Sequence, residues 1–112
     1  MEKRNKTKSE RVVLSECLVE LSKHGARVFR NNTGVLWNKA GQPVKFGLCV
    51  GSSDIIGIYK GRMIAVEVKA TGKRVKPNSA QDKFIRMIRE QGGIAFECDN
   101  ARNIKKLLDD HS

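Results

Sequence analysis

Three ionisable residues stand in or beside two apolar segments in the middle of the chain. Asp54 precedes the segment IIGIY, and Glu67 and Lys69 belong to the next segment, RMIAVEVKA. A charged side chain among apolar neighbours is costly unless it is paired, exposed at a strand end or bound to a metal. The three residues therefore indicate either a chemically active site or a set of ion pairs.

The spacing of the two segments places these residues together. Both segments alternate in the manner of β-strands, and only Lys60 and Gly61 separate them, which predicts a tight antiparallel hairpin. Glu67 and Lys69 share one face of their strand because side chains alternate, and the hairpin brings Asp54 to the same end. Two adjacent carboxylates repel unless a cation lies between them, and a hard divalent ion with oxygen ligands removes that repulsion. The alternative is a ladder of cross-strand ion pairs.

A helix near the N-terminus positions a further acid. Ser9 is a suitable N-cap, and the helix is expected to run to about His24 and to end at Gly25. Its apolar stripe consists of Leu14, Cys17, Leu18 and Leu21. One turn before this stripe stands Glu10, which could then reach the edge of the sheet. A first-turn glutamate is equally explained by the helix dipole, so both interpretations stay open.

The remaining segments alternate between strand and helix patterns. The expected elements are a strand over 26–30, a hairpin around 40–41, a helix over 79–91, a strand over 94–98 and a helix over 101–110. With the N-terminal helix, they predict an α/β fold in which helices flank a mixed central β-sheet. On the helix over 79–91, Gln81 shares the inward face with Ile88. Trp37, in the hairpin, is expected either to stack on a base or, as is commoner, to pack beneath the loop.

Composition indicates the partner and the compartment. The 112 residues include 22 Lys and Arg against 12 Asp and Glu, a net charge of +10 that favours nucleic acid as the partner. Residues 1–8 are predicted to form a basic, flexible arm, and residues 9–112 a single domain. The three separated cysteines, Cys17, Cys49 and Cys98, are expected to be buried free thiols in a reducing cytoplasm. No apolar run approaches the length of a membrane span.

At Asp54 and the sequence Glu67-Val68-Lys69 the chain resembles the PD-(D/E)xK nuclease signature. The wider segments SERVVLSECLVELSKHGARVFRNNTG, FGLCVGSSDIIGI and AVEVKATGKRVKPNSAQDKFIRMIREQGGIAFEC resemble the small stand-alone VRR-NUC domains of phages and bacteria, over roughly residues 9–108. This resemblance implies a restriction-endonuclease-like core, α-β-β-β-α-β, with an extra hairpin and a C-terminal helix. The chain departs from the family pattern at Ser53, which replaces a proline, and at Leu14, where many relatives carry a polar residue.

The resemblance also implies roles for individual residues. Asp54, Glu67, Lys69 and Gln81 would be catalytic. Mg²⁺, or Mn²⁺ in its place, would be bound by Asp54, Glu67, the backbone carbonyl of Val68 and Glu10. The implied function is a Mg²⁺-dependent, structure-selective DNA endonuclease that cuts Holliday junctions or other branched DNA as a homodimer, in the cytoplasm of a bacterial host if a phage encodes it. The alternatives are a nuclease on linear duplex or single-stranded DNA, and a non-catalytic nucleic-acid-binding module.

Basic residues around these positions would contact DNA. The candidates for DNA binding are Arg30, Trp37, Lys39, Lys73, Arg74, Lys76 and Lys83. Arg30 occupies the position of a basic residue that is common in the family after the first strand, and the lysines and arginines would neutralise phosphates. Charge runs more often form a solvated surface, which is the preferred interpretation of the cluster Arg102, Lys105 and Lys106. The sequence holds no base-reading helix pattern, so recognition by shape is expected.

Overall fold

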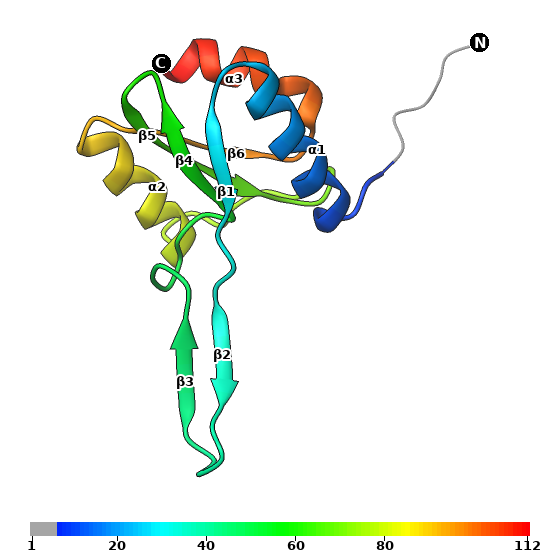
Figure 1. Cartoon of the computed structure of the whole chain (residues 1–112). Helices are drawn as coiled ribbons and strands as arrows, with labels where there is room; N and C mark the ends of the chain where they lie inside the picture. Colours follow the sequence, from blue (N-terminus) through cyan, green and yellow to red (C-terminus); the bar gives the residue numbers. More distant parts are fainter. Residues whose placement is uncertain (1–6) are drawn as a thin grey trace.

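The computed structural model describes residues 7–112 of the chain (Figure 1). In chain order its elements are α1 (Glu10–Lys23), β1 (Arg27–Arg30), β2 (Gly34–Trp37), β3 (Pro43–Phe46), β4 (Ile55–Tyr59), β5 (Arg62–Val68), α2 (Ala80–Glu90), β6 (Ile94–Cys98), a 3₁₀ turn (Ala101–Asn103) and α3 (Ile104–His111). The sequence predicted this order of helices and strands correctly. Within residues 7–112, no helix combines the length and the apolar character needed to cross a membrane.

The predicted flexible arm over residues 1–8 falls mostly outside the described part of the chain. Its last residue, Lys8, is hydrogen-bonded to the loop that follows β5. The backbone N–H of Lys8 donates to Thr71 Oγ1 at 3.0 Å, and the backbone N–H of Thr71 donates to the Lys8 carbonyl at 3.0 Å. Lys8 Nζ also lies 2.9 Å from the Glu16 carboxylate on α1. Lys8 therefore connects α1 to the loop.

Four strands form the central sheet, in the order β1-β4-β5-β6. The first three strands are antiparallel, whereas β6 is parallel to β5 because α2 carries the chain back between them. Helices α1 and α3 cover one face of the sheet and α2 lies on the other (Figure 1). The prediction of a mixed central sheet flanked by helices is therefore confirmed.

The β4–β5 hairpin has the tight turn that the sequence predicted. Lys60 and Gly61 both have positive φ, 50° and 77°, as a two-residue primed turn requires. The pairing brings Ile55 opposite Val66 and continues toward the turn. On the outer side of β4, a Cβ atom at Gly57 would lie 1.9 Å from the Arg27 carbonyl oxygen. Glycine at this position therefore permits the close approach of β1.

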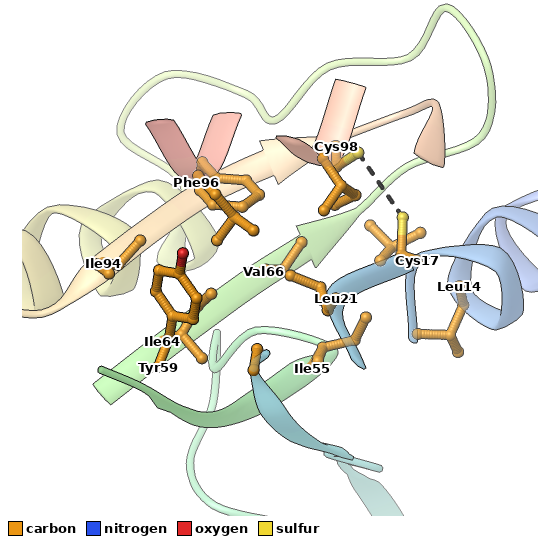
Figure 2. Close-up of a cluster of buried hydrophobic side chains, with 14 of the residues drawn as sticks. Leu14, Cys17, Leu21, Ile55, Tyr59, Ile64, Val66, Ile94, Phe96 and Cys98 are labelled. Carbon is orange, nitrogen blue, oxygen red and sulfur yellow. Dashed lines mark hydrogen bonds between the residues drawn. The ribbon is translucent and has the colours of Figure 1, made fainter. Parts of the chain in front are cut away.

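The larger hydrophobic cluster lies between the sheet and helices α1 and α3 (Figure 2). It joins the first and last parts of the fold, because Cys17 on α1 and Cys98 on β6 are both buried, with their sulfur atoms 3.7 Å apart. These two thiols are buried as predicted. The prediction for Cys49 was wrong, because this residue is exposed in the loop that follows β3, and residues 41–50 around it are all exposed as well.

The smaller cluster lies beneath α2, which covers only part of its face of the sheet. The cluster consists of Ala65, Phe84, Ile85, Ile88 and Ala95. Toward β1 the same face is open, since Phe29 is 66% exposed and Ile58 is 59% exposed. The end of the face where β4 begins and β5 ends carries the carboxylates described below.

Strands β2 and β3 form a separate two-stranded sheet that projects from the rest of the molecule (Figure 1). We call residues 34–50 the β2–β3 ribbon. Its seven large apolar side chains, all exposed, are Val35, Leu36, Trp37, Val44, Phe46, Leu48 and Val50. The preferred expectation that Trp37 packs beneath a loop was wrong, because no element covers the ribbon and the Trp37 residue is 70% exposed.

Candidate active site

Asp54 and Glu67 lie opposite each other on neighbouring strands. Ile55 pairs with Val66. Asp54, which immediately precedes β4, therefore lies directly across from Glu67, which follows Val66 in β5. The Asp54 carboxylate is oriented by the backbone N–H of Val68, which donates to Asp54 Oδ2 at 2.8 Å. The structure therefore brings together, on one face of the sheet, the two carboxylates that the hairpin spacing predicted.

Glu67 is the most unusual ionisable group of this cluster. Its residue is only 5% exposed, and its Oε2 atom is buried without a hydrogen-bond partner. Burial raises the pKa of Glu67 to about 8, and the charge of Asp54 and a hydrogen bond with it add to the increase. A cation at this position would lower the pKa again, because it would stabilise the ionised carboxylate.

Lys69 and Glu10 complete the electrostatic environment of Glu67. The charge of Lys69 lowers the Glu67 pKa and the charge of Glu10 raises it, so both groups lie close enough to interact. Glu10, at the start of α1, also lines a cleft of about 390 Å³ together with Asp54 and Arg30. Position on this cleft favours a role at the site over a purely local interaction with the helix dipole.

The carboxylate pair fits a divalent cation, although it does not form a larger acidic cluster. Within residues 7–112, no group of three or more His, Cys, Asp and Glu side chains is placed to hold one metal ion. A cation here would rely on Asp54, Glu67 and non-carboxylate oxygens such as the backbone carbonyl of Val68. The unpaired Oε2 atom and the mutual repulsion of the two acids are the features that an oxygen-binding cation would relieve.

Asn31 holds the backbone beside Asp54, and sequence reasoning missed it. Its Nδ2 donates to Ser52 Oγ at 2.7 Å and to the Ser53 carbonyl at 2.9 Å. Its backbone N–H donates to the carbonyl of Asp54. These bonds tie the chain that leaves β1 to the segment that enters β4. The NNTG motif indicates a turn at this asparagine, but it does not indicate these distant partners.

Glu97 is a second residue that the sequence analysis did not single out. It pairs in register with Glu67 across the parallel strands β5 and β6. Instead of joining the carboxylate pair, it accepts a hydrogen bond from the Val75 backbone N–H at 3.3 Å and lies 3.9 Å from the Arg74 guanidinium. The alternation of IAFEC could have shown that Glu97 shares a face with Glu67, but its loop partners depend on the tertiary structure.

The predicted DNA-binding residues occupy three different places. Lys73, Lys76 and Lys83 are exposed on the loop after β5 and on α2. Arg74 belongs to the same loop, but its guanidinium also lies 3.6 Å from Asp99. The remaining positions lie at the end of β1, for Arg30, and on the ribbon, for Trp37 and Lys39. Figure 1 shows that the far end of the ribbon points away from the sheet that carries the carboxylates.

Gln81 lies in the first turn of α2 and is half-buried. This helix begins at the Ser79 N-cap, whose side chain accepts a hydrogen bond from the Asp82 backbone N–H.

Comparison with known proteins adds no assignment, since no family model and no curated protein sequence matches the chain. The chemistry of the site therefore follows from its own arrangement, which is a buried carboxylate pair, a nearby lysine and a polar cleft.

Proposed function

We propose that this protein is a Mg²⁺-dependent, structure-selective DNA endonuclease that hydrolyses phosphodiesters of branched DNA, such as a four-way junction. The observation that carries the proposal is the pairing of Asp54 with the buried Glu67, whose Oε2 lacks a partner. The resemblance of the sequence to VRR-NUC domains supports the same function. A restriction-endonuclease-like core is part of this proposal and agrees with the mixed sheet flanked by helices.

Asp54, Glu67 and the Val68 carbonyl would hold the cation, with Glu10 at the rim of the cleft. A bound Mg²⁺ would neutralise the acids and polarise a phosphodiester as a Lewis acid. Lys69 stands beside the pair, where its ammonium group would offset the negative charge that grows on the phosphate during hydrolysis. Asn31 keeps the Asp54 backbone in place, and Gln81 would help to orient Lys69, water or phosphate.

Water would attack phosphorus in line with the departing oxygen, and the products would be a 5′-phosphate and a 3′-hydroxyl. The exposed cations of the loop after β5 and of α2, together with Arg30, would neutralise neighbouring phosphates. Such contacts position a nucleic acid without reading its bases. This is the basis for proposing selection by DNA shape rather than by sequence.

Labelled DNA substrates test the proposal directly. The purified full chain is incubated with a four-way junction, its linear duplex arms and the single strands, each with Mg²⁺, Mn²⁺ or EDTA. We expect metal-dependent cutting that is strongest on the junction. Glu67→Ala should abolish cutting while junction binding, measured by fluorescence anisotropy in EDTA, stays largely unchanged. Glu90→Ala, which removes an exposed acid at the end of α2, is the matched control and should retain full activity.

The other outcomes assign the protein differently. Equal cutting of the linear duplex would retain the nuclease and reject junction selectivity. Junction binding without any cutting, in either metal, would indicate a non-catalytic nucleic-acid-binding module. Cutting by Glu67→Ala at the wild-type rate would show that the carboxylate pair is not the active site.

A further inference from the structure

Two buried thiols face each other between the first helix and the last strand, and the proposed catalysis uses neither of them. Cys17 on α1 is 0% exposed, and Cys98 at the end of β6 is 2% exposed. Figure 2 shows their sulfur atoms directed toward each other, and the Cys17 thiol donates a hydrogen bond to Cys98 Sγ at 3.7 Å. The two residues lie 81 positions apart in the sequence. Their contact therefore joins the N-terminal and C-terminal parts of the fold.

The two sulfur atoms are close enough to form a covalent bond after a small movement. A disulfide bond is about 2.05 Å long, so the sulfur atoms, now 3.7 Å apart, need to approach by roughly 1.7 Å. Helix α1 packs on the sheet through apolar side chains, whose contacts do not require a fixed direction. Rotation of the two side chains and a slight shift of α1 are therefore sufficient to bring the sulfur atoms to bonding distance.

Loss of both thiol hydrogens leaves the nearby backbone carbonyl with a donor. The Cys98 thiol donates to the carbonyl of Asn100 at 3.1 Å. The same carbonyl also accepts a hydrogen bond from the backbone N–H of Asn103 at 3.0 Å. A buried polar group that loses its partner destabilises the fold, and oxidation of this pair does not have that effect at Asn100.

The two thiols differ in acidity, and this difference sets the order in which they react. The hydrogen bond from Cys17 lowers the pKa of Cys98, whereas the same hydrogen bond, together with burial, raises the pKa of Cys17. The thiolate, rather than the thiol, reacts with oxidants. Cys98 is therefore the residue that is oxidised first, and Cys17 is the one that reacts with the product.

We propose that Cys17 and Cys98 form a reversible disulfide bond when the protein meets a hydroperoxide, and that this bond fastens α1 to β6. The Cys98 thiolate attacks one oxygen of the hydroperoxide and becomes a sulfenic acid, while the O–O bond breaks and the second oxygen leaves with the proton that Cys98 released. The Cys17 sulfur then attacks the Cys98 sulfur, and the hydroxyl group leaves with the Cys17 proton as water. Two thiols are oxidised by two electrons, and one hydroperoxide is reduced to water and an alcohol, or to two waters if it is hydrogen peroxide.

The bond would restrain both the unfolded chain and the surroundings of the candidate site. A link across 81 positions removes much of the conformational freedom of the unfolded chain. In the folded protein, the Cys98 carbonyl accepts a hydrogen bond from the Lys69 backbone N–H at 3.0 Å, and α1 carries Glu10. The disulfide therefore joins the two elements that position these residues. Its formation does not require the proposed nuclease activity, so the two proposals can fail separately.

A peroxide treatment tests directly for the bond. Cys49 is exposed and would form links between molecules, so the full chain with Cys49→Ser is used. The reduced, metal-free protein is treated with hydrogen peroxide at low protein concentration, the excess is removed with catalase, and free thiols are alkylated in denaturant. We expect a monomer without alkylated cysteine, whose tryptic digest contains residues 12–23 joined to residues 90–102. Dithiothreitol should restore both thiols.

Thermal unfolding measures what the bond does to the fold. The oxidised protein should unfold at a temperature higher than that of the reduced protein by on the order of 10 °C, and dithiothreitol should remove the difference. Cys17→Ala in the same background is the control, since it keeps Cys98 without a second sulfur, and peroxide should not raise its unfolding temperature. The comparison of the oxidised and reduced parent protein decides the outcome even if the control variant folds poorly.

Three results would overturn the proposal. Two thiols that stay free after peroxide treatment of the folded protein would show that the pair is not oxidised. A sulfinic acid at Cys98, or a disulfide between two molecules, would show that Cys17 does not react with the first oxidation product. A disulfide within one chain that leaves the unfolding temperature unchanged, or lowers it, would show that the bond does not fasten α1 to β6.

Discussion

Two antiparallel hairpins of this chain have opposite surroundings. The β4–β5 hairpin lies at the centre of the sheet between two layers of helices, and the five residues 64–68 of β5 are all buried. In the β2–β3 ribbon, by contrast, every residue of β3 is exposed. Both hairpins are rich in apolar residues. The comparison shows that packing helices, rather than the composition of the hairpin, decide whether a hairpin is buried.

The two hairpins also differ in how far their charged side chains are exposed to water. Glu67 is enclosed beside Asp54, and this environment raises its pKa to about 8. Lys39 and Lys45 on the ribbon remain exposed to water. Binding of a counter-ion strongly stabilises a charged group that the fold has removed from water, whereas it stabilises an exposed charged group only slightly. A cation is expected at β5, where a carboxylate is buried, and not on the ribbon, because residues 34–50 contain two lysines and no acid.

The largest effect on the buried hairpin should come from Asp54→Asn. The amide keeps an oxygen that can accept the hydrogen bond from Val68, so the fold should persist. The lost negative charge weakens cation binding, and cutting of the junction should fall by at least about 1,000-fold, equivalent to about 4 kcal/mol. Asp109→Asn on the exposed side of α3 should cut normally. Activity of Asp54→Asn close to that of the control would contradict the assigned role.

A truncation inside the buried hairpin should be the largest effect on stability. Ile64 is fully buried, and Ile64→Ala should lower the free energy of unfolding by about 2 to 5 kcal/mol because it leaves a cavity. Chemical denaturation monitored by circular dichroism measures this change. A loss below 1 kcal/mol, by the same rule, would mean that the sheet is not packed between the helices in solution.

The stability of the metal-free protein should depend on the charge of Glu67. The folded-state pKa of about 8 lies above the ordinary value of 4.5, so the folded protein binds this proton more tightly. The resulting stabilisation is complete below pH 4.5 and is lost as the pH rises through 8. Glu67→Gln is neutral throughout, and at pH 8 it should be more stable than the wild type by up to about 4 kcal/mol, since one unit of pKa shift corresponds to about 1.4 kcal/mol.

Denaturant titrations at several pH values check this difference. Glu90→Gln should follow the wild-type pH dependence, because Glu90 is exposed. Mg²⁺ at the upper end of the window should raise the stability of the wild type but not that of Glu67→Gln. Identical pH profiles for the wild type and Glu67→Gln would show that Glu67 titrates normally.

The smallest effect is expected on the ribbon. Val44 is 47% exposed, and Val44→Ala should change the unfolding free energy by no more than about 0.5 kcal/mol. Thermal unfolding of both variants measures the contrast with Ile64→Ala. A large loss of stability would show that the ribbon packs on the rest of the molecule.

Sequence patterns predicted the parts of the site that depend on local geometry. The Lys60-Gly61 turn fixes the hairpin register, and side-chain alternation then places Asp54 and Glu67 on one face. The order of helices and strands followed from periodicity and from turn residues. These features are determined by residues close together in the chain, and a single sequence therefore predicts them.

The features that were missed depend on distant packing. The exposure of Cys49 and Trp37 could not be deduced from their apolar neighbours, because those neighbours are exposed too. The contacts of Asn31 join residues 21 and 22 positions apart, and Arg74 meets acids on β6 and just beyond it. Such contacts are set by how the layers assemble, which periodicity does not describe.

The contact between Cys17 and Cys98 has a consequence for synthesis on the ribosome. Both carboxylates leave the exit tunnel before β6, yet the strand that carries Glu67 is enclosed only when the last strand and α3 have joined the first helix. A nascent chain therefore cannot complete this centre until β6 and α3 have also left the ribosome. Prematurely terminated products would carry the acids in water, without the environment that makes one of them unusual.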